Sequence, residues 1–146
     1  MKAIFLLLLV LISCFSCTLN AEQEQALARD ISKYFEARNN GDALMYLSFT
    51  HPSVVKHYQL LGNEKIRERF QRDDYKWQSF MQKDIIQKDE LYQVKMEVRM
   101  GDYYNEIDST VMLYATSREN GLNWLFIEEQ DYFQDYFPEK ERLFGE

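Results

Sequence analysis

The stretch from Tyr34 to Phe70 constrains the fold more than any other part of this 146-residue chain. A helical apolar pattern stops at Asn39-Asn40-Gly41-Asp42, where the glycine favours a C-terminal cap and the aspartate an N-terminal cap. Pro52 ends the short helix that follows, and Gly62-Asn63 precedes a further helical pattern. The sequence therefore predicts an extended segment over 53–60 and three helices, over Glu22–Asn39, Ala43–Phe49 and Asn63 to about Met81.

The second half of the chain has the period of β-strands. Val94, Met96 and Val98 are separated by charged residues, and a similar alternation runs over 107–116. This period is typical of a strand with one buried face. A third strand is predicted over 124–133. Helices followed by antiparallel strands predict an α+β fold, with the helices on one face of a curved sheet.

The N-terminal segment predicts export. Lys2 is followed by an apolar run over 3–12 and then by small residues, as in a secretory signal peptide. The run is well short of the ~20 residues that span a bilayer. Cleavage after Ala21 would remove a signal peptide over 1–21 and leave one domain over 22–146. Alternatively, Leu11-Ile12-Ser13-Cys14 resembles a lipoprotein signal over 1–13, with Cys14 lipidated. Both routes lead to the periplasm or cell envelope, as a soluble or a lipid-anchored protein.

The composition disfavours several function classes. The chain has 24 acidic and 17 basic residues, and this acidity disfavours binding to nucleic acid or to anionic lipid. Membrane contact is therefore expected only through a lipid on Cys14. The other cysteine, Cys17, also lies in the targeting segment. The domain over 22–146 thus has no thiol for a disulfide, a nucleophile or zinc binding.

Several motifs resemble nuclear transport factor 2-like proteins, the superfamily of the ketosteroid isomerases and the SnoaL-like polyketide cyclases. These motifs are the helix end over 34–42, the Pro-containing turn, the Gly that precedes a helix with Ile and Phe, and the late strand with Trp124. The resemblance covers most of 22–133. It implies a cone-shaped sheet against three N-terminal helices, a cavity between them, and dimerisation through the open sheet face. Function stays open, because the fold hosts enzymes, binding proteins and assembly domains.

Tyr34 and His57 are the candidate catalytic residues. The resemblance to the isomerases places Tyr34 where a phenol donates to a developing oxyanion, and a low dielectric strengthens such a donor. The carboxylate base of the isomerases has no counterpart over 54–58, where only His57 could accept a proton at neutral pH. The strand carboxylate Asp108 is expected on the wrong face of the sheet. A packed tyrosine and a partly exposed histidine are the favoured interpretations of the two candidates.

Large apolar residues are candidates for the lining of a pocket. Methionine adapts to irregular ligands, and aromatic rings provide flat walls. The same residues also suit an ordinary core. The predicted lining consists of Tyr34, Trp77, Met96, Met112 and Trp124.

No metal or other cofactor is expected. His51 and His57 do not have the spacing of metal ligands on a helix. The acids Glu128, Glu129 and Asp131 are typical of a solvated strand edge. No serine has the sequence context of a hydrolase nucleophile.

The sequence thus favours a non-enzymatic, exported domain that binds a small apolar ligand or a protein partner and that forms a homodimer. The alternative is a ketosteroid-isomerase-like or polyketide-cyclase-like enzyme, in which Tyr34 and His57 perform general acid–base chemistry on a small apolar substrate. A third possibility is a structural dimer module in an envelope assembly. The absence of the expected carboxylate base separates the first interpretation from the second.

Overall fold

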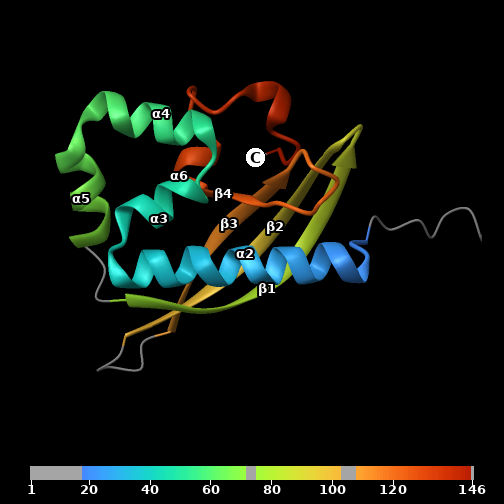
Figure 1. The fold of residues 1–146 in the computed structure, drawn as a ribbon, viewed down its shortest axis with the longest axis horizontal. Helices are drawn as coiled ribbons and strands as arrows, with labels where there is room; N and C mark the ends of the chain where they lie inside the picture. Colours follow the sequence, from blue (N-terminus) through green and yellow to red (C-terminus); the bar gives the residue numbers. More distant parts are fainter. Residues whose placement is uncertain (1–17, 72–74, 103–107, 146) are drawn as a thin grey trace, which may run out of the picture.

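A computed structural model describes residues 18–71, 75–102 and 108–145 and places helices against an open, four-stranded antiparallel sheet (Figure 1). The predicted α+β class is confirmed. The predicted signal peptide and Cys14 lie outside the described residues. Within these residues, no helix is long and apolar enough to cross a membrane. The elements are α2 (Ala21–Asn40), α3 (Ala43–Ser48), α4 (Pro52–Leu61), α5 (Asn63–Gln71), β1 (Tyr75–Lys88), β2 (Leu91–Asp102), β3 (Asp108–Ser117), β4 (Leu125–Glu128), α6 (Glu129–Tyr132) and a 3₁₀ turn (Glu139–Glu141).

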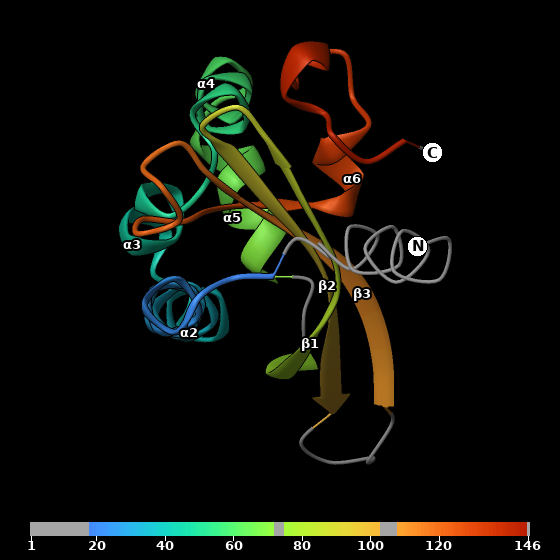
Figure 2. The ribbon, with the colours of Figure 1, turned by 90° about the vertical axis from the view of Figure 1, so that its right-hand side faces the viewer.

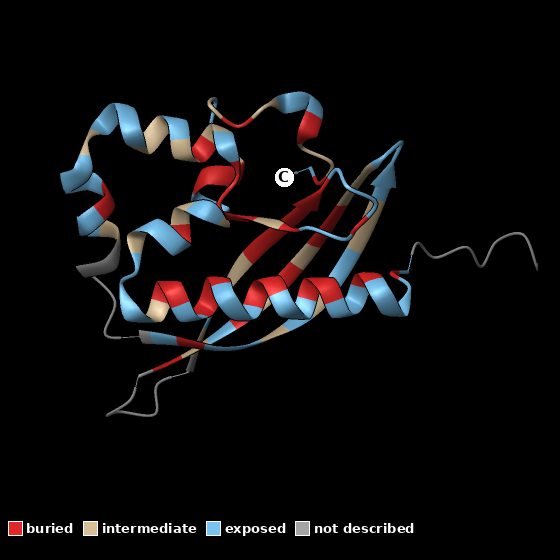
Figure 3. Cartoon of the chain, viewed as in Figure 1, coloured by how far each residue is buried: buried red, intermediate tan, exposed pale blue. Residues whose placement is uncertain are grey.

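Helix α2 is closed at both ends by residues suited to capping. The side chain of Asn20 accepts from the backbone N–H of Gln23, and the Gln23 side chain accepts from the backbone N–H of Asn20, which makes a capping box. At the other end, Gly41 has φ of 69°, as predicted for a left-handed cap. One face of the helix is buried along its length (Figure 3). That face carries Leu27 and Ile31 against the inner side of the sheet.

Two predicted elements differ from the structure. The segment over 53–60 was predicted to be extended, but it is helix α4, in which Pro52 occupies the first turn and the side chain of His51 accepts from the backbone N–H of Ser53. Proline is well suited to that position because its missing N–H would have no helical partner there. The described residues therefore contain four helices before the sheet, where the sequence predicted three.

The second difference is strand β1, which carries Trp77 and Met81 and which the sequence analysis assigned to a helix. Two register shifts, between Trp77 and Ser79 and between Gln82 and Asp84, interrupt its pairing with β2. Each bulge offsets the alternation of buried and exposed residues by one position. The apolar residues of β1 therefore resemble a helical pattern.

The sheet has the order β1-β2-β3-β4. Val94, Met96 and Val98 of β2 are fully buried toward α2, as the predicted alternation requires. The predicted strand over 124–133 is shorter in the structure, because β4 ends at Glu128 and α6 follows immediately. Thr50 bridges Phe126 on the far side of β4, so the edge of the sheet is partly covered.

The C-terminal segment, residues 129–145, forms a second core on the outer face of the sheet. Figure 2 shows α6 and this segment on the side of the sheet opposite α2 and α3. The ring of Tyr132 stacks on Tyr114 with centroids 3.8 Å apart, and Phe144 packs beside them. The buried amide of Gln93 donates to the carbonyl of Glu141 and accepts from the N–H of Leu143. This arrangement covers part of the sheet face that the resemblance assigned to dimerisation.

Replacing Gln93 by Leu should loosen this segment. The substitution removes these two hydrogen bonds and a third, which the Gln93 side chain accepts from the hydroxyl of Tyr132. The partners left unpaired should lower the free energy of unfolding by roughly 2 kcal/mol or more. Amide exchange at Leu143 should accelerate accordingly. The matched control is Gln87→Leu on the exposed part of β1, which should leave both quantities unchanged. Retained protection at Leu143 in Gln93→Leu would contradict the proposed role of the amide.

Candidate functional site

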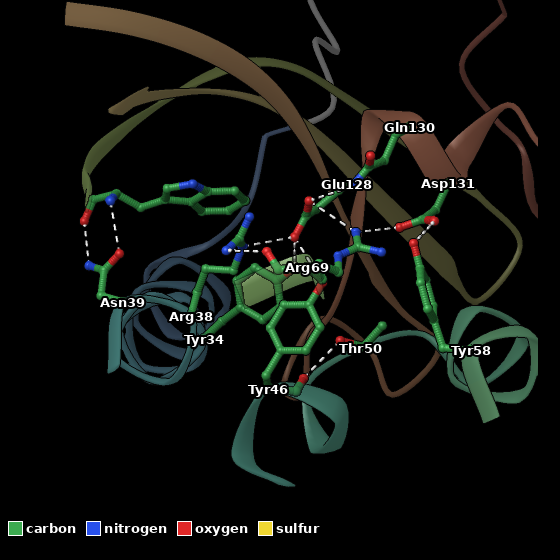
Figure 4. Close-up of polar contacts among 11 residues, drawn as sticks. Tyr34, Arg38, Asn39, Tyr46, Thr50, Tyr58, Arg69, Glu128, Gln130 and Asp131 are labelled. Atoms are coloured by element: carbon green, nitrogen blue, oxygen red, sulfur yellow. Dashed lines mark hydrogen bonds and ion pairs between the residues drawn. The ribbon is translucent and has the colours of Figure 1, made fainter. Parts of the chain in front are cut away.

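The carboxylate of Glu128 is the centre of a buried polar cluster (Figure 4). Its Oε1 accepts from the hydroxyl of Tyr46 at 2.8 Å, from the hydroxyl of Tyr34 at 3.2 Å and from Nε of Arg38 at 3.2 Å. Its Oε2 lies 2.9 Å from Nη2 of Arg69. The carboxylate is thereby held by side chains from three helices. The chain brings them together because Tyr34 and Arg38 are one turn apart on α2, with Tyr46 on α3 and Arg69 on α5.

A second carboxylate, that of Asp131, extends the cluster. The Nη2 atom of Arg69 lies 2.6 Å from Oδ2 of Asp131, while Oδ1 accepts from the hydroxyls of Tyr136 at 2.6 Å and Tyr58 at 3.3 Å. The guanidinium of Arg69 also lies over the ring of Tyr58, 4.7 Å from its centroid. Arg69 thus connects the two carboxylates. We call Glu128, Asp131, Arg38, Arg69, Tyr34 and Tyr46 the Glu128 cluster.

Electrostatics keep Glu128 ionised. Burial alone would raise the pKa of its carboxyl group, but attraction to Arg69 and Arg38 and the hydrogen bond from Tyr46 outweigh burial, so the pKa lies below its ordinary value. Burial, followed by the neighbouring phenol and the charge of Glu128, raises the pKa of Tyr34 well above 10. Both states favour the same bond, in which a neutral phenol donates to a carboxylate. Glu128 is therefore an acceptor in this cluster and has no proton to donate at neutral pH.

The two candidate catalytic residues have different surroundings. Tyr34 is fully buried; its hydroxyl is bonded to Glu128, and its ring packs against Tyr46 and Phe126. His57 is half-buried and stacks on the ring of Tyr136 with centroids 3.8 Å apart. Among the described residues, no hydrogen bond or ring contact joins Tyr34 to His57. The side chain of Asp108, the third isomerase-like position, lies outside the described residues.

The predicted pocket residues divide into two groups. Trp77 and Met112 line a common pocket of about 260 Å³, together with Met100 and Val111. We call this the Trp77 pocket; its polar wall is formed by Arg38, Glu128, Glu129 and Gln130. Tyr34, Met96 and Trp124, by contrast, are core residues with at most 1% of their surface exposed. They do not line the Trp77 pocket, so this part of the predicted lining belongs to the ordinary core.

A neighbouring pocket of about 340 Å³ shares Arg38 and Gln130 with the Trp77 pocket. We call it the Arg69 pocket. Its remaining lining comes from α4 and α5, with Lys65 and Glu68 paired at 2.7 Å near its rim. The Glu128 cluster therefore lies between two hollows and supplies polar groups to both.

The acids predicted to form a solvated edge are not equivalent. Glu129 is exposed, but Glu128 and Asp131 are 8% and 1% exposed. The prediction was wrong for these two because it did not identify their partners Arg38 and Arg69, which lie about 60 to 90 residues away in the sequence. The sequence did contain one indication of the Glu128 cluster, because Tyr34 and Arg38 lie one turn apart on the same face of the predicted helix.

Within the described residues, no group of three or more His, Cys, Asp or Glu side chains could hold a metal ion.

A separate hydrogen-bonded chain contains the residue types of a serine nucleophile relay. Nδ1 of His51 lies 2.8 Å from Oγ of Ser53, and Nε2 lies 3.0 Å from Oε2 of Glu141. However, the N–H of Ser53 donates to His51 Nδ1, and those of the next two residues donate to the His51 carbonyl. These N–H groups are thus not available to form an oxyanion hole. The arrangement caps α4 and attaches the C-terminal segment to it.

The substitution Glu128→Gln should destabilise the protein strongly. It removes the carboxylate that pairs with both Arg38 and Arg69, although Asp131 still pairs with Arg69. Breaking a buried ion pair typically lowers the free energy of unfolding by about 3–5 kcal/mol. The lowered pKa of Glu128 stabilises the native state above the unfolded value of about 4.5, and this contribution disappears as the pH falls below it. Chemical denaturation between pH 7 and pH 3 should therefore show a smaller acid loss in the variant. Its matched control, Glu129→Gln, alters the exposed neighbour and should behave as the wild type; equal effects of the two substitutions would contradict the assignment.

The comparisons with known proteins give no assignment. No family model matches the chain, and neither a curated protein nor a solved structure does. The resemblance to nuclear transport factor 2-like proteins therefore stays a prediction from the residues, and the function has to be argued from the site itself.

Proposed function

We propose that the protein is an exported, non-enzymatic domain that binds a small, mainly apolar ligand in the Trp77 pocket. The observation that carries this proposal is that the carboxylate and the phenols of the Glu128 cluster are bonded to one another. Its carboxylate accepts from both Tyr34 and Tyr46 and is paired with two arginines. Such a cluster stabilises a rigid wall, but it offers no free acid, base or nucleophile for a reaction.

The composition of the pocket supports an apolar ligand with one polar group. Trp77, Met100, Val111 and Met112 provide aromatic, thioether and aliphatic surface. The buried indole N–H of Trp77 has no hydrogen-bond partner within the described part of the chain. A ligand carbonyl or ether oxygen could accept from it and remove the penalty of a buried, unpaired donor. The expected ligand therefore has an apolar body and a hydrogen-bond acceptor.

The enzyme alternative has less support. An isomerase-like reaction needs a phenol directed at the substrate and a base within reach of the same atom. The hydroxyl of Tyr34 donates to Glu128, while the described ring contacts of His57 are with Tyr58 and Tyr136. An enzyme would have to break the first bond and provide a base other than a free carboxylate.

A homodimer remains part of the proposal, with a smaller interface than the resemblance implies. The C-terminal segment already packs on Tyr114 and Ile127 on the outer sheet face. The part of the face left for a second copy includes Lys83 and Glu97, paired at 3.4 Å, and Met81, which is 55% exposed. A protein partner instead of a second copy would use the same area.

Acetophenone is a suitable probe for the Trp77 pocket, because it combines a small apolar ring with a carbonyl acceptor. In ¹H–¹⁵N spectra of the exported protein, the indole signal of Trp77 should shift saturably as acetophenone is added. The chain has two tryptophans, and the indole N–H of Trp124 already donates to the carbonyl of Gly121 at 2.8 Å. The Trp124 signal should therefore stay in place and serve as an internal control.

Met112→Asp should weaken acetophenone binding at least roughly tenfold, because it places a charge in an apolar wall. Met81→Asp is the matched control on the exposed part of β1 and should bind as the wild type. An unmoved Trp77 signal, or equal affinity of the two variants, would exclude this pocket as the binding site.

A further inference from the structure

A third pocket, of about 380 Å³, lies where the start of α4, the end of β3 and the C-terminal segment meet. We call it the Thr116 pocket. It shares no lining residue with the Trp77 pocket or the Arg69 pocket. Any ligand bound there would therefore be independent of the proposed function.

One residue that lines this pocket has a buried hydroxyl without a partner among the described residues. Thr116 is 4% exposed, and its Oγ1 makes no hydrogen bond to any described residue. Its direct cross-strand neighbour is Gln93, whose amide is already bonded to the C-terminal segment at Glu141 and Leu143. Buried hydroxyls in folded proteins are nearly always paired. Because Thr116 also lines the pocket, its unpaired Oγ1 points to a ligand that can bond to it.

Other polar groups beside Thr116 are held in fixed positions. Nε2 of His51 lies 3.0 Å from Oε2 of Glu141, and the other oxygen of Glu141 accepts from Arg118. Burial lowers the pKa of His51 below 6.5, although Glu141 acts in the opposite direction. The imidazole is therefore neutral at neutral pH. Arg118 and Glu141 balance each other, and the side chain of Arg118 is 64% exposed at the opening.

The charges around the pocket limit the class of ligand. A free anion is disfavoured, because the carboxylates of Glu119 and Glu141 outnumber the guanidinium of Arg118. A cation is also disfavoured, because the buried group that lacks a partner is a neutral hydroxyl, and because the Glu141 carboxylate already has two partners. A hydroxyl both donates and accepts, and it is matched best by another hydroxyl.

Two further features favour a ligand with several hydroxyl groups. Ser117 accepts from the N–H groups of Glu119 and Gly121, and no described residue accepts its own hydroxyl hydrogen. Pro52 and Leu125 add apolar surface to the same lining, which suits the C–H faces of a sugar ring. The volume falls within the range of small-molecule sites. We propose that the Thr116 pocket binds a small neutral saccharide, with Thr116 bonded to a sugar hydroxyl.

The test uses D-glucose, D-galactose and N-acetyl-D-glucosamine as probes, with phosphate and ethanolamine as an anion and a cation. In ¹H–¹⁵N spectra of the exported protein, at least one saccharide should shift the amide signals of Glu119 and Gly121 saturably. Thr116→Val should weaken that binding roughly tenfold, the usual effect of losing one hydrogen bond. The same substitution should raise the thermal unfolding midpoint, because it removes an unpaired buried hydroxyl.

Thr110→Val is the matched control, since Thr110 lies on the same strand but is exposed; it should leave saccharide binding unchanged. Three results would overturn the proposal: no saturable shift with any of the three saccharides, saturation by phosphate or ethanolamine instead, or unchanged affinity in Thr116→Val. A lower unfolding midpoint in Thr116→Val would also overturn it, because it would show that the hydroxyl is paired within the protein.

Discussion

The ionised carboxylate of Glu128 is the interaction on which the arrangement of the helices depends. It ends the short edge strand β4, yet it is bonded to side chains of α2, α3 and α5. An unpaired buried charge is highly unfavourable, so each helix has to lie where its donor reaches the carboxylate. Hydrophobic burial is non-directional and leaves helices free to slide, whereas these bonds specify distance and orientation. The apolar core under α2 stabilises the layers, and the Glu128 cluster determines their relative positions.

The Glu128 cluster consists of residue types that are common in active sites, but here they stabilise the structure. A buried carboxylate, two arginines and two phenols beside a pocket would suggest an active site from residue type alone. The geometry supports another role, because the phenols donate to the carboxylate and the arginines neutralise it. A phenol and a carboxylate that are hydrogen-bonded to each other are not available to react with a bound molecule. Among the described residues, the buried side-chain atoms without a hydrogen-bond partner are Nε and Nη1 of Arg69, the indole N–H of Trp77 and the hydroxyl of Thr116. These three residues line three different pockets. Unpaired atoms are therefore better guides to ligands here than residue type alone.

The α+β class, the buried face of α2, its cap at Gly41 and the alternation in β2 could be predicted from the sequence, because each depends on local period or local capping. Strand β1 could not, since its two bulges disrupt the period of two. Helix α4 was missed because Pro52 was interpreted only as the end of the preceding helix, although proline also suits a first turn. In the site, Trp77 and Met112 of the predicted lining lie at one pocket, because both belong to apolar stretches that the sequence shows. The burial of Glu128 and Asp131 was not predictable, since their partners lie far along the chain and pairing between distant charges leaves no periodic pattern.

The second core has a consequence for the order in which the protein folds. The first core needs α2 and strands β1 to β4, and these elements are complete at residue 128. The second core needs Phe144, and the buried amide of Gln93 has no backbone partners until residues 141 and 143 are present. A nascent chain emerges from its N-terminus, so Tyr114 and Gln93 stay uncovered on the outer sheet face until residues 132–144 have been released. Residues that are made after the whole of the first core thus close an exposed aromatic surface, and any factor that protects the unfinished chain has to act on that face.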